Sequence, residues 1–202
     1  MVEREQIEQE IKLFLSEIEY LRLHDHLMQN AQFLGSLTQR NIYLETADYK
    51  LTRAKEMLRL REVDKLWTIT HKSGIKVEDA QFKSHEWELD LGKYTESVED
   101  LIVKLQKIPR LENLTNLMVQ GELINIRHQF IWGKLILELD QSHFTNQHVD
   151  YELECETNDI QSSISKLTHL FNSLEIPWVP QKSSKYRRFL EYYQLSNAAK
   201  TL

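Results

Sequence analysis

The most regular feature of the chain is a strict alternation of polar and apolar residues. In the segment 7–13, Glu8, Glu10 and Lys12 fall on one face of an extended strand and the apolar residues fall mostly on the other, because successive side chains of a strand point to opposite faces. The same alternation recurs in seven further segments, at 39–45, 58–61, 67–72, 86–91, 124–130, 134–140 and 151–156. The pattern predicts eight strands, each with an apolar face and a charged or strongly polar face.

Helical periodicity occupies much of the remaining sequence. Apolar residues spaced three and four apart predict helices over 16–31, 95–107 and 158–174, and a shorter helix over 185–194. The first of these opens with Ser16 followed three residues later by Glu19, which is the signature of a capping box. The chain therefore combines eight amphipathic strands with amphipathic helices, which is an α+β composition.

Two architectures satisfy this pattern. In the simpler one, an antiparallel sheet keeps its charged face in water and its apolar face under helices. In the other, the sheet closes into a barrel whose charged side chains line the lumen, while the apolar side chains face an outer layer of helices. Alternation alone is consistent with both.

Composition narrows the class of protein. The 202 residues are 41% hydrophobic and form no compositional break, so we expect one domain over 1–202. The net charge of −6 disfavours a nucleic-acid partner bound by overall charge. Cys155 is the one cysteine and lies on the apolar side of its segment, which predicts a buried structural thiol in a reducing compartment. With a charged N-terminal segment and no apolar run of 18 residues, the sequence predicts a cytoplasmic protein without a membrane partner.

The charges on the polar strand faces are separated by sign, so that individual faces are mainly acidic or mainly basic. Glu8 with Glu10 and Glu86 with Glu88 are acidic, whereas other faces are basic. Carboxylates two apart on a strand lie roughly 7 Å apart on one face, and converging carboxylates provide the hard oxygen ligands that Mg²⁺ or Mn²⁺ prefers. Arg and Lys suit phosphate oxygens. A single pair such as Glu86 and Glu88 is most simply a solvated strand face, but the joint pattern across eight strands favours phosphoryl-transfer chemistry.

Six motifs, in order and spacing from about residue 7 to 190, resemble those of the CYTH or triphosphate tunnel metalloenzyme superfamily. They are Glu8-x-Glu10-x-Lys12, Gln39-x-Asn41-x-Tyr43, Leu58-Arg59-Leu60-Arg61, Thr68-Ile69-Thr70-His71-Lys72, Tyr151-Glu152-Leu153-Glu154-Cys155-Glu156 and Ser184-Lys185-Tyr186-Arg187-Arg188. The strongest likeness is to plant-type and small bacterial inorganic triphosphatases. The resemblance implies an eight-stranded antiparallel barrel with a charged tunnel and helices packed outside.

The resemblance also implies roles for individual residues. Those that would bind the triphosphate are Lys12, Arg59, Arg61, Lys72, Arg127 and Lys185, with Arg188 as a further candidate. Those that would bind one or two Mg²⁺ or Mn²⁺ ions are Glu8, Glu10, Asp140, Glu152 and Glu154, with Glu156 able to replace one of them. Glu152 or Glu154 would accept the proton of the attacking water, and Lys185 would stabilise or protonate the leaving group.

The implied reaction is hydrolysis of inorganic tripolyphosphate to pyrophosphate and phosphate. A thiamine triphosphatase, a class IV adenylate cyclase and a non-catalytic module that binds polyphosphate or nucleotides stay open as alternatives, because all four share the residues that hold phosphate. The expected partner is a small polyphosphate, with no nucleic acid and no membrane, bound by a monomer or a homodimer.

Overall fold

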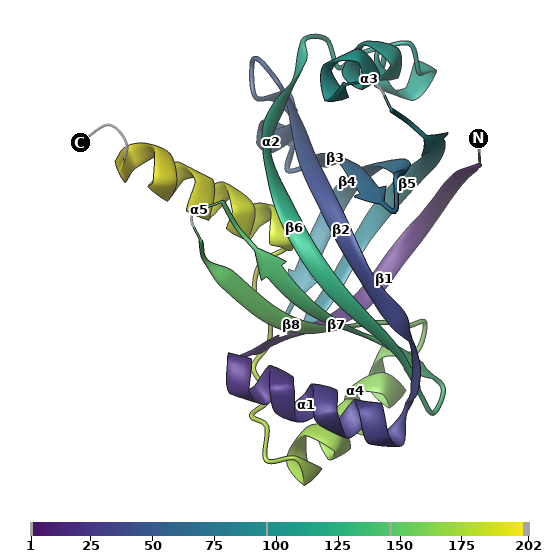
Figure 1. Cartoon of the computed structure of the whole chain (residues 1–202), viewed down its shortest axis with the longest axis vertical. Helices are drawn as coiled ribbons and strands as arrows, with labels where there is room; N and C mark the ends of the chain where they lie inside the picture. The colour runs from purple at the N-terminus through teal and green to yellow at the C-terminus, as the bar shows by residue number, and fades with distance from the viewer. Residues whose placement is uncertain (1, 96, 146, 200–202) are drawn as a thin grey trace.

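Eight strands close into an antiparallel barrel in the computed structural model, which describes residues 2–95, 97–145 and 147–199 (Figure 1). Around the barrel the strands follow the order β1-β5-β4-β3-β2-β6-β7-β8, and each neighbouring pair is antiparallel. The strands are β1 (Glu3–Leu15), β2 (Gln32–Thr46), β3 (Met57–Val63), β4 (Leu66–Glu78), β5 (Gln81–Lys93), β6 (Leu117–Trp132), β7 (Leu135–His143) and β8 (Val149–Glu156). The closed barrel is confirmed, and the open sheet is wrong.

Tight hairpins fix the register of this barrel. Between β3 and β4, Asp64 and Lys65 have φ values of 50° and 66° and connect the paired residues Val63 and Leu66. Two consecutive left-handed residues form a two-residue turn whose twist matches that of the flanking strands. The resulting register places the polar face of β3 beside that of β4, inside the barrel.

The helices lie outside the barrel (Figure 1). They are α1 (Glu17–Asn30), α2 (Lys50–Ala54), α3 (Val98–Leu105), α4 (Ile160–Ser173) and α5 (Lys185–Ala199), with a 3₁₀ turn at Pro109–Leu111. Four of them were predicted, whereas the short α2 was not. The capping box is confirmed, because the Glu19 backbone N–H donates to Ser16 Oγ and the Ser16 N–H donates to Glu19 Oε2. The predicted helix over 95–107 begins at Val98, and Glu96 lies outside the described residues.

The hydrophobic core forms a layer between the barrel and the helices. Helices α1 and α4 bury Leu23 and Phe171 in one cluster with Leu13 of β1. Helix α3 buries Leu101 in a second cluster with Trp87 of β5. Each such side chain stabilises the fold by about 1.5–3 kcal/mol through removal of apolar surface from water. The apolar strand faces are thereby covered from outside, and the polar faces are left to the lumen.

Helix α5 packs aromatic side chains against strand β2 of the barrel. The ring centroid of Tyr43 lies 4.9 Å from that of Tyr186 and 4.8 Å from that of Phe189. Gly121 on β6 permits this approach, since a Cβ atom there would lie 2.7 Å from Cζ of Phe189. The packing holds the first residue of α5, Lys185, at the lumen.

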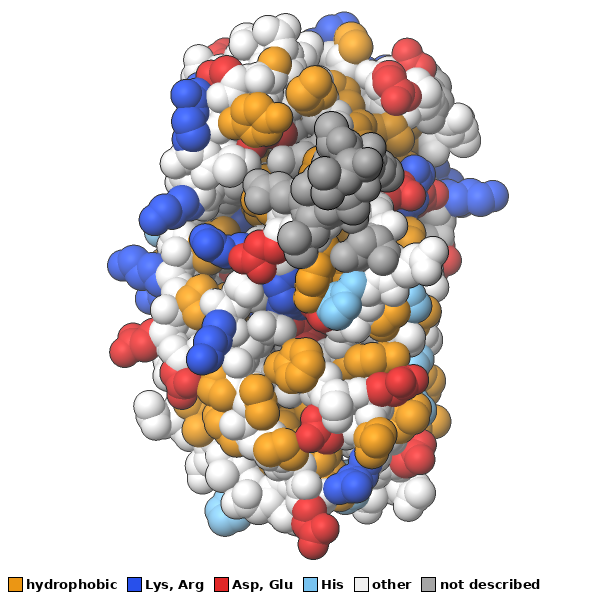
Figure 2. Space-filling view, turned by 90° about the vertical axis from the view of Figure 1, so that its left-hand side faces the viewer, with side chains coloured by type: hydrophobic (Ala, Val, Ile, Leu, Met, Phe, Trp, Pro, Cys, Tyr) orange, Lys and Arg blue, Asp and Glu red, His pale blue; other side chains and the backbone are white. Residues whose placement is uncertain are grey.

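The surface on the α5 side carries mixed charges. In Figure 2 acidic and basic side chains are interspersed on this face, and apolar side chains gather in its lower half, toward α1 and α4. None of the helices in the described part of the chain combines the length and the apolar character that crossing a membrane requires.

Candidate active site

The barrel lumen is a cavity of about 250 Å³ with strongly charged walls. Seven carboxylates and seven cationic side chains line it, namely Glu8, Glu10, Glu86, Glu88, Glu138, Glu154, Glu156, Lys12, Arg59, Arg61, Lys72, Lys83, Arg127 and Lys185. Folded proteins bury charges only where they are paired or functional, because removing a charge from water is costly. The lumen is therefore suited to an ionic ligand.

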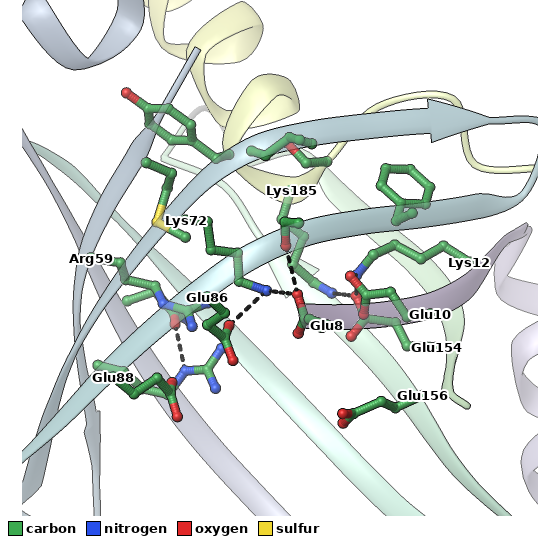
Figure 3. A pocket seen from close by; sticks show the side chains of 18 of the residues that line it. Glu8, Glu10, Lys12, Arg59, Lys72, Glu86, Glu88, Glu154, Glu156 and Lys185 are labelled. Atoms are coloured by element: carbon green, nitrogen blue, oxygen red, sulfur yellow. Dashed lines mark hydrogen bonds and ion pairs between the residues drawn. The ribbon is translucent and has the colours of Figure 1, made fainter. Parts of the chain in front are cut away.

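Strand alternation brings the predicted residues into this cavity. Figure 3 shows Glu8, Glu10 and Lys12 of β1 converging with Glu154 of β8 and Lys185 of α5. All the residues predicted to bind triphosphate line the cavity, apart from Arg188. The charged stripes that are far apart in sequence thus line one cavity.

Glu154 is the residue at which three cationic side chains meet. Its Oε1 atom lies 2.5 Å from Lys12 Nζ and 2.7 Å from Lys185 Nζ, and its Oε2 atom lies 2.6 Å from Arg127 Nη2. Burial raises the pKa of Glu154, but Lys12, Lys185 and Arg127 outweigh burial and hold that pKa well below its ordinary value. Glu154 is therefore an ionised carboxylate at the centre of the site.

Asp140, Glu152 and Glu154 form a buried trio of carboxylates. Each offers one oxygen, and these oxygens lie within 4.8 Å of one another. Lys185 Nζ lies 2.7 Å from Asp140 Oδ2 and also contacts Glu152 Oε1, in addition to its contact with Glu154. Burial raises the pKa of Asp140, but Arg127 and Lys185 lower it further, to about 2.

This carboxylate trio fits a divalent metal ion. An all-oxygen donor set of carboxylates suits Mg²⁺ or Mn²⁺ rather than zinc. The ammonium group of Lys185 already lies against all three residues, so the centre is built to hold positive charge. The side chains of Asp140 and Glu152 are 0% and 1% exposed and lie behind the cavity wall, so a cation held here would approach the lumen through Glu154.

Lys12 connects the predicted metal ligands of β1 to this trio. Its Nζ atom lies 2.9 Å from Glu10 Oε1 and 2.5 Å from Glu154 Oε1. Burial raises the pKa of Glu10 to about 7, and Lys12 offsets burial only in part. Glu10 and Glu154 are thus close neighbours across one ammonium group.

Glu8 belongs to a second ionic cluster. Lys72 Nζ contacts Glu8 Oε2 and lies 2.9 Å from Glu86 Oε2, and Ser84 donates to the same Glu8 oxygen over 3.2 Å. Burial raises the pKa of Glu8, but the charges of Lys72 and then Lys12 bring it below its ordinary value. Glu8 therefore faces the lumen as a carboxylate paired with Lys72.

Arg59 and Arg61 on β3 have no carboxylate partner among the described residues. Arg59 is 8% exposed and donates from Nη2 to Thr70 Oγ1 over 3.3 Å, while its buried Nε atom has no hydrogen-bond partner in that part of the chain. Arg61 donates from Nε to Asn41 Oδ1 over 3.0 Å. Burial, followed by the charges of Arg59 and Arg127, lowers the pKa of Arg61 to about 10. Two guanidinium groups therefore face the cavity without an ion pair in the described chain, and Glu88 and Glu138 offset the charge of Arg61 only in part, which leaves the donors that an anion site requires.

Two predicted residues lie away from the centre. Arg188 is buried behind the cavity, where Nε lies 2.7 Å from Asp150 Oδ2 and Nη2 lies 2.8 Å from Glu152 Oε2. The structure does not bring Arg188 to a triphosphate in the lumen, and its guanidinium instead holds Glu152. Glu156 lines the cavity but is exposed, and Figure 3 shows it apart from the Glu8, Glu10 and Glu154 group.

Several lumen residues were not predicted as part of the site. The interpretation of Glu86 and Glu88 as a solvated strand face is wrong for Glu86, which is 6% exposed and paired with Lys72. Glu138 contacts Arg127 inside the barrel. Glu86 and Glu138 lie at alternate positions on the polar faces of their strands, so the alternation that predicted the other lumen residues also indicated these two. Lys83 lies before the alternating segment 86–91, and no sequence signal pointed to it.

A comparison with protein families adds the decisive observation. The model of the CYTH domain matches residues 6–189, which is nearly the whole chain. The chain belongs to the CYTH domain family. The matched span contains every residue that the sequence assigned to the site, from Glu8 to Arg188.

CYTH-like barrels also appear among solved structures. HpAC1 from Hippeastrum, for which a dominant triphosphatase activity is described, is 25% identical with a TM-score of 0.82, over 91% of this chain and 95% of that chain. A proposed adenylate cyclase of Bacillus halodurans is 25% identical with a TM-score of 0.64, and the match covers 92% of this chain and 98% of that chain. The PH1819 protein of Pyrococcus horikoshii OT3 shares the fold. It is 17% identical with a TM-score of 0.65, and the match covers 92% of this chain and 99% of that chain. No curated protein matches the chain.

Proposed function

We propose that this CYTH protein is a metal-dependent hydrolase that cleaves inorganic tripolyphosphate to pyrophosphate and phosphate inside its barrel. The observation that carries the proposal is the state of Arg59 and Arg61, which line the barrel lumen with no carboxylate ion pair among the described residues. Burying two unpaired cations side by side costs stability, and a polyanionic ligand offsets that cost.

The charge balance of the lumen supports a divalent cofactor. Its seven carboxylates and seven cations cancel, whereas tripolyphosphate brings about four to five negative charges into a site of low dielectric constant. One or two Mg²⁺ or Mn²⁺ ions would compensate most of that excess. The residues that fit this role best are Asp140, Glu152 and Glu154, with Glu10 beside them.

The chain's own residues have distinct tasks in the reaction. Arg59, Arg61 and Lys72 bind phosphate oxygens and hold the chain of phosphates along the lumen. When bound, the metal ion supplies positive charge to the phosphate oxygens and lowers the pKa of water. Glu154, which lines the lumen, accepts the proton of the attacking water while the water oxygen bonds to the terminal phosphorus and the bridging P–O bond breaks. Glu152 was the other candidate for this proton, but it lies behind the cavity wall against Lys185 and Arg188.

Lys185 acts on the other side of the bond that breaks. Burial lowers its pKa, but Asp140 and then Glu152 and Glu154 raise it above its ordinary value, so it enters the reaction as an ammonium ion. As an ammonium it stabilises or protonates the departing pyrophosphate. The products are one phosphate and one pyrophosphate for each tripolyphosphate and water consumed.

Within the family two kinds of relative support related activities. The HpAC1 protein has a dominant triphosphatase activity, which favours hydrolysis, and the Bacillus halodurans relative is proposed as an adenylate cyclase. The residues that hold phosphates serve both reactions, and the organic group would be recognised outside the triphosphate cradle. The cytoplasmic location, the absence of nucleic-acid partners and the monomeric or dimeric state stay predictions from the sequence.

A substrate panel tests the proposal. Purified protein is incubated with tripolyphosphate, thiamine triphosphate or ATP, each with Mg²⁺, Mn²⁺ or excess EDTA, and phosphate, pyrophosphate and cyclic AMP are assayed. We expect metal-dependent release of phosphate and pyrophosphate from tripolyphosphate at the highest kcat/KM. Formation of cyclic AMP from ATP would contradict the proposal and indicate an adenylate cyclase. Preferred cleavage of thiamine triphosphate would indicate a thiamine triphosphatase. Binding of these substrates without turnover would indicate a non-catalytic module.

A further inference from the structure

Lys185 occupies the place where the carboxylate trio would hold a metal ion. Its Nζ atom lies 2.7 Å from Asp140 Oδ2 and 2.7 Å from Glu154 Oε1, and it also contacts Glu152 Oε1. These three residues are the ones whose oxygens lie within 4.8 Å of one another. One ammonium group therefore lies among the three carboxylates that would otherwise take a divalent cation, although Glu152 Oε1 has no hydrogen-bond partner among the described residues.

An ammonium and a divalent cation cannot share this centre. Mg²⁺ binds carboxylate oxygens at about 2.0–2.1 Å, so it needs the same lone pairs that Lys185 uses. Two cations about 4 Å apart also repel each other strongly where water is scarce, and the exposed fractions of Asp140, Glu152 and Glu154 side chains are 0%, 1% and 6%. Metal binding therefore requires the Lys185 side chain to leave.

The fold permits that movement without moving the helix. Arg188, one turn further along α5, is clamped by Asp150 and Glu152, and its Nη1 atom donates to the Ser183 carbonyl oxygen over 2.7 Å. The start of α5 is thus fixed, whereas the four-carbon stem of Lys185 is flexible. Lys185 also lines the lumen, so its ammonium can turn toward phosphate oxygens there.

We propose that Lys185 is an internal competitor for the metal ion, which it releases to the carboxylate trio when a polyphosphate in the lumen offers the ammonium another anionic partner. This inference rests on the proposed function, because the second partner is the triphosphate. Metal and polyphosphate then bind with positive cooperativity, since each favours the same position of Lys185. Couplings of this kind typically change affinity about 5- to 150-fold.

The test is calorimetric titration of the folded protein with Mn²⁺ alone, in the wild type and in Lys185→Met. Without polyphosphate, Lys185→Met binds Mn²⁺ at least about tenfold more tightly than the wild type, because the competing ammonium is gone. Lys83→Met is the matched control: Lys83 also lines the lumen but has no ion pair in the described part of the chain, and we expect a change of less than about threefold. Equal or weaker Mn²⁺ binding by Lys185→Met would overturn the inference.

A second titration measures the cooperativity itself. In the presence of an imido-bridged triphosphate that cannot be hydrolysed, the Mn²⁺ affinity of the wild type rises at least fivefold more than that of Lys185→Met, in which only the direct attraction between Mn²⁺ and the phosphate oxygens remains. An equal rise in both proteins would refute the exchange. Turnover of tripolyphosphate by the wild type is measured separately, so loss of the proposed reaction and loss of the exchange give different results.

Thermal unfolding keeps the test decisive if Lys185→Met folds poorly. Removing the ammonium leaves three buried carboxylates without their shared partner, so the variant unfolds at a lower temperature than the wild type. Addition of Mn²⁺ restores its unfolding temperature by more than it raises that of the wild type. If Mn²⁺ has no greater effect on Lys185→Met than on the wild type, the ammonium does not stand in for the metal.

Discussion

Arg61 donates from Nε to the Oδ1 atom of Asn41 over 3.0 Å, and this neutral amide is its one hydrogen-bond or ion-pair partner among the described residues. Arg127, in the same lumen, instead contacts the carboxylates of Glu138, Asp140 and Glu154. The two arginines therefore have opposite relations to the stability of the empty barrel. One is held ready for a ligand, and the other is part of the framework.

Replacing Arg61 is expected to stabilise the protein in the absence of substrate. Burial and the neighbouring cations lower the pKa of Arg61 to about 10, so the folded state disfavours its charged form. The unfolded chain then binds more protons only between about pH 10 and the ordinary value of 12.5, and below pH 10 the penalty is constant. Arg61→Gln raises the free energy of unfolding by about 1–2 kcal/mol at every pH from 6 to 9.

Chemical denaturation with and without tripolyphosphate measures the two effects of Arg61, its cost to the stability of the free protein and its contribution to ligand binding. The wild type gains stability when tripolyphosphate is added in EDTA, and Arg61→Gln gains clearly less because one anion-binding group is lost. A variant that is less stable than the wild type without ligand would show that Arg61 is structural.

Replacing Arg127 is expected to have the opposite effect. Its guanidinium neutralises buried carboxylates, and the pKa of Arg127 itself is raised because Asp140, Glu138 and Glu154 outweigh burial. Arg127→Met leaves these acids without a partner and lowers the free energy of unfolding by about 3–5 kcal/mol. Urea denaturation of Arg127→Met and Arg61→Gln at pH 7 measures both free energies of unfolding. Equal changes in the two variants would contradict the different roles of Arg61 and Arg127.

Cys155 is expected to be chemically inert in the folded protein. Its side chain is fully buried, and burial, then Glu138 and Glu156, raise the pKa of the thiol to about 12. The thiolate fraction at pH 8 is on the order of one in ten thousand. Ellman's reagent at pH 8 therefore reacts with one thiol only after denaturation, and rapid reaction of the native protein would show that Cys155 is accessible.

Gly121 is expected to determine how closely α5 packs against β6. A methyl group at this position would meet Phe189 Cζ at 2.7 Å, so Gly121→Ala displaces the ring or the helix and costs about 1–3 kcal/mol of stability. Because α5 carries Lys185, tripolyphosphate turnover falls as well. Phe189→Leu makes room for the methyl group, so the double variant is more stable than the sum of the single effects, and simple additivity would argue against the contact.

Much of the barrel was predictable because alternation on a strand is a local property of the sequence. Glu8, Glu10, Lys12, Arg59 and Arg61 share the polar parity of their strands, and that parity is also what places them in the lumen. Closure of the sheet is not a local property. It followed from the family resemblance, since an open sheet shows the same alternation.

The roles of the basic residues were less predictable from sequence. Lys185 and Arg188 are three residues apart in one motif, yet one lines the lumen and the other is buried behind Glu152. That difference depends on the position of α5 against β8, which three-dimensional packing decides. The sequence likewise gave no indication that Arg59 lacks an acidic partner in the described chain whereas Lys12 has two.

Phosphorus NMR of tripolyphosphate tests the central claim most directly. The wild type, Arg59→Met and the surface control Arg53→Met are each incubated with tripolyphosphate and Mg²⁺, and the wild type also with EDTA; Arg53 is 66% exposed and pairs with Asp48 outside the barrel. We predict equal amounts of phosphate and pyrophosphate from the wild type and from Arg53→Met with Mg²⁺, none with EDTA, and at least a hundredfold slower release from Arg59→Met. Tripolyphosphate left intact by the wild type, or cleaved equally well by Arg59→Met, would contradict a charged tunnel built to hydrolyse a polyanion.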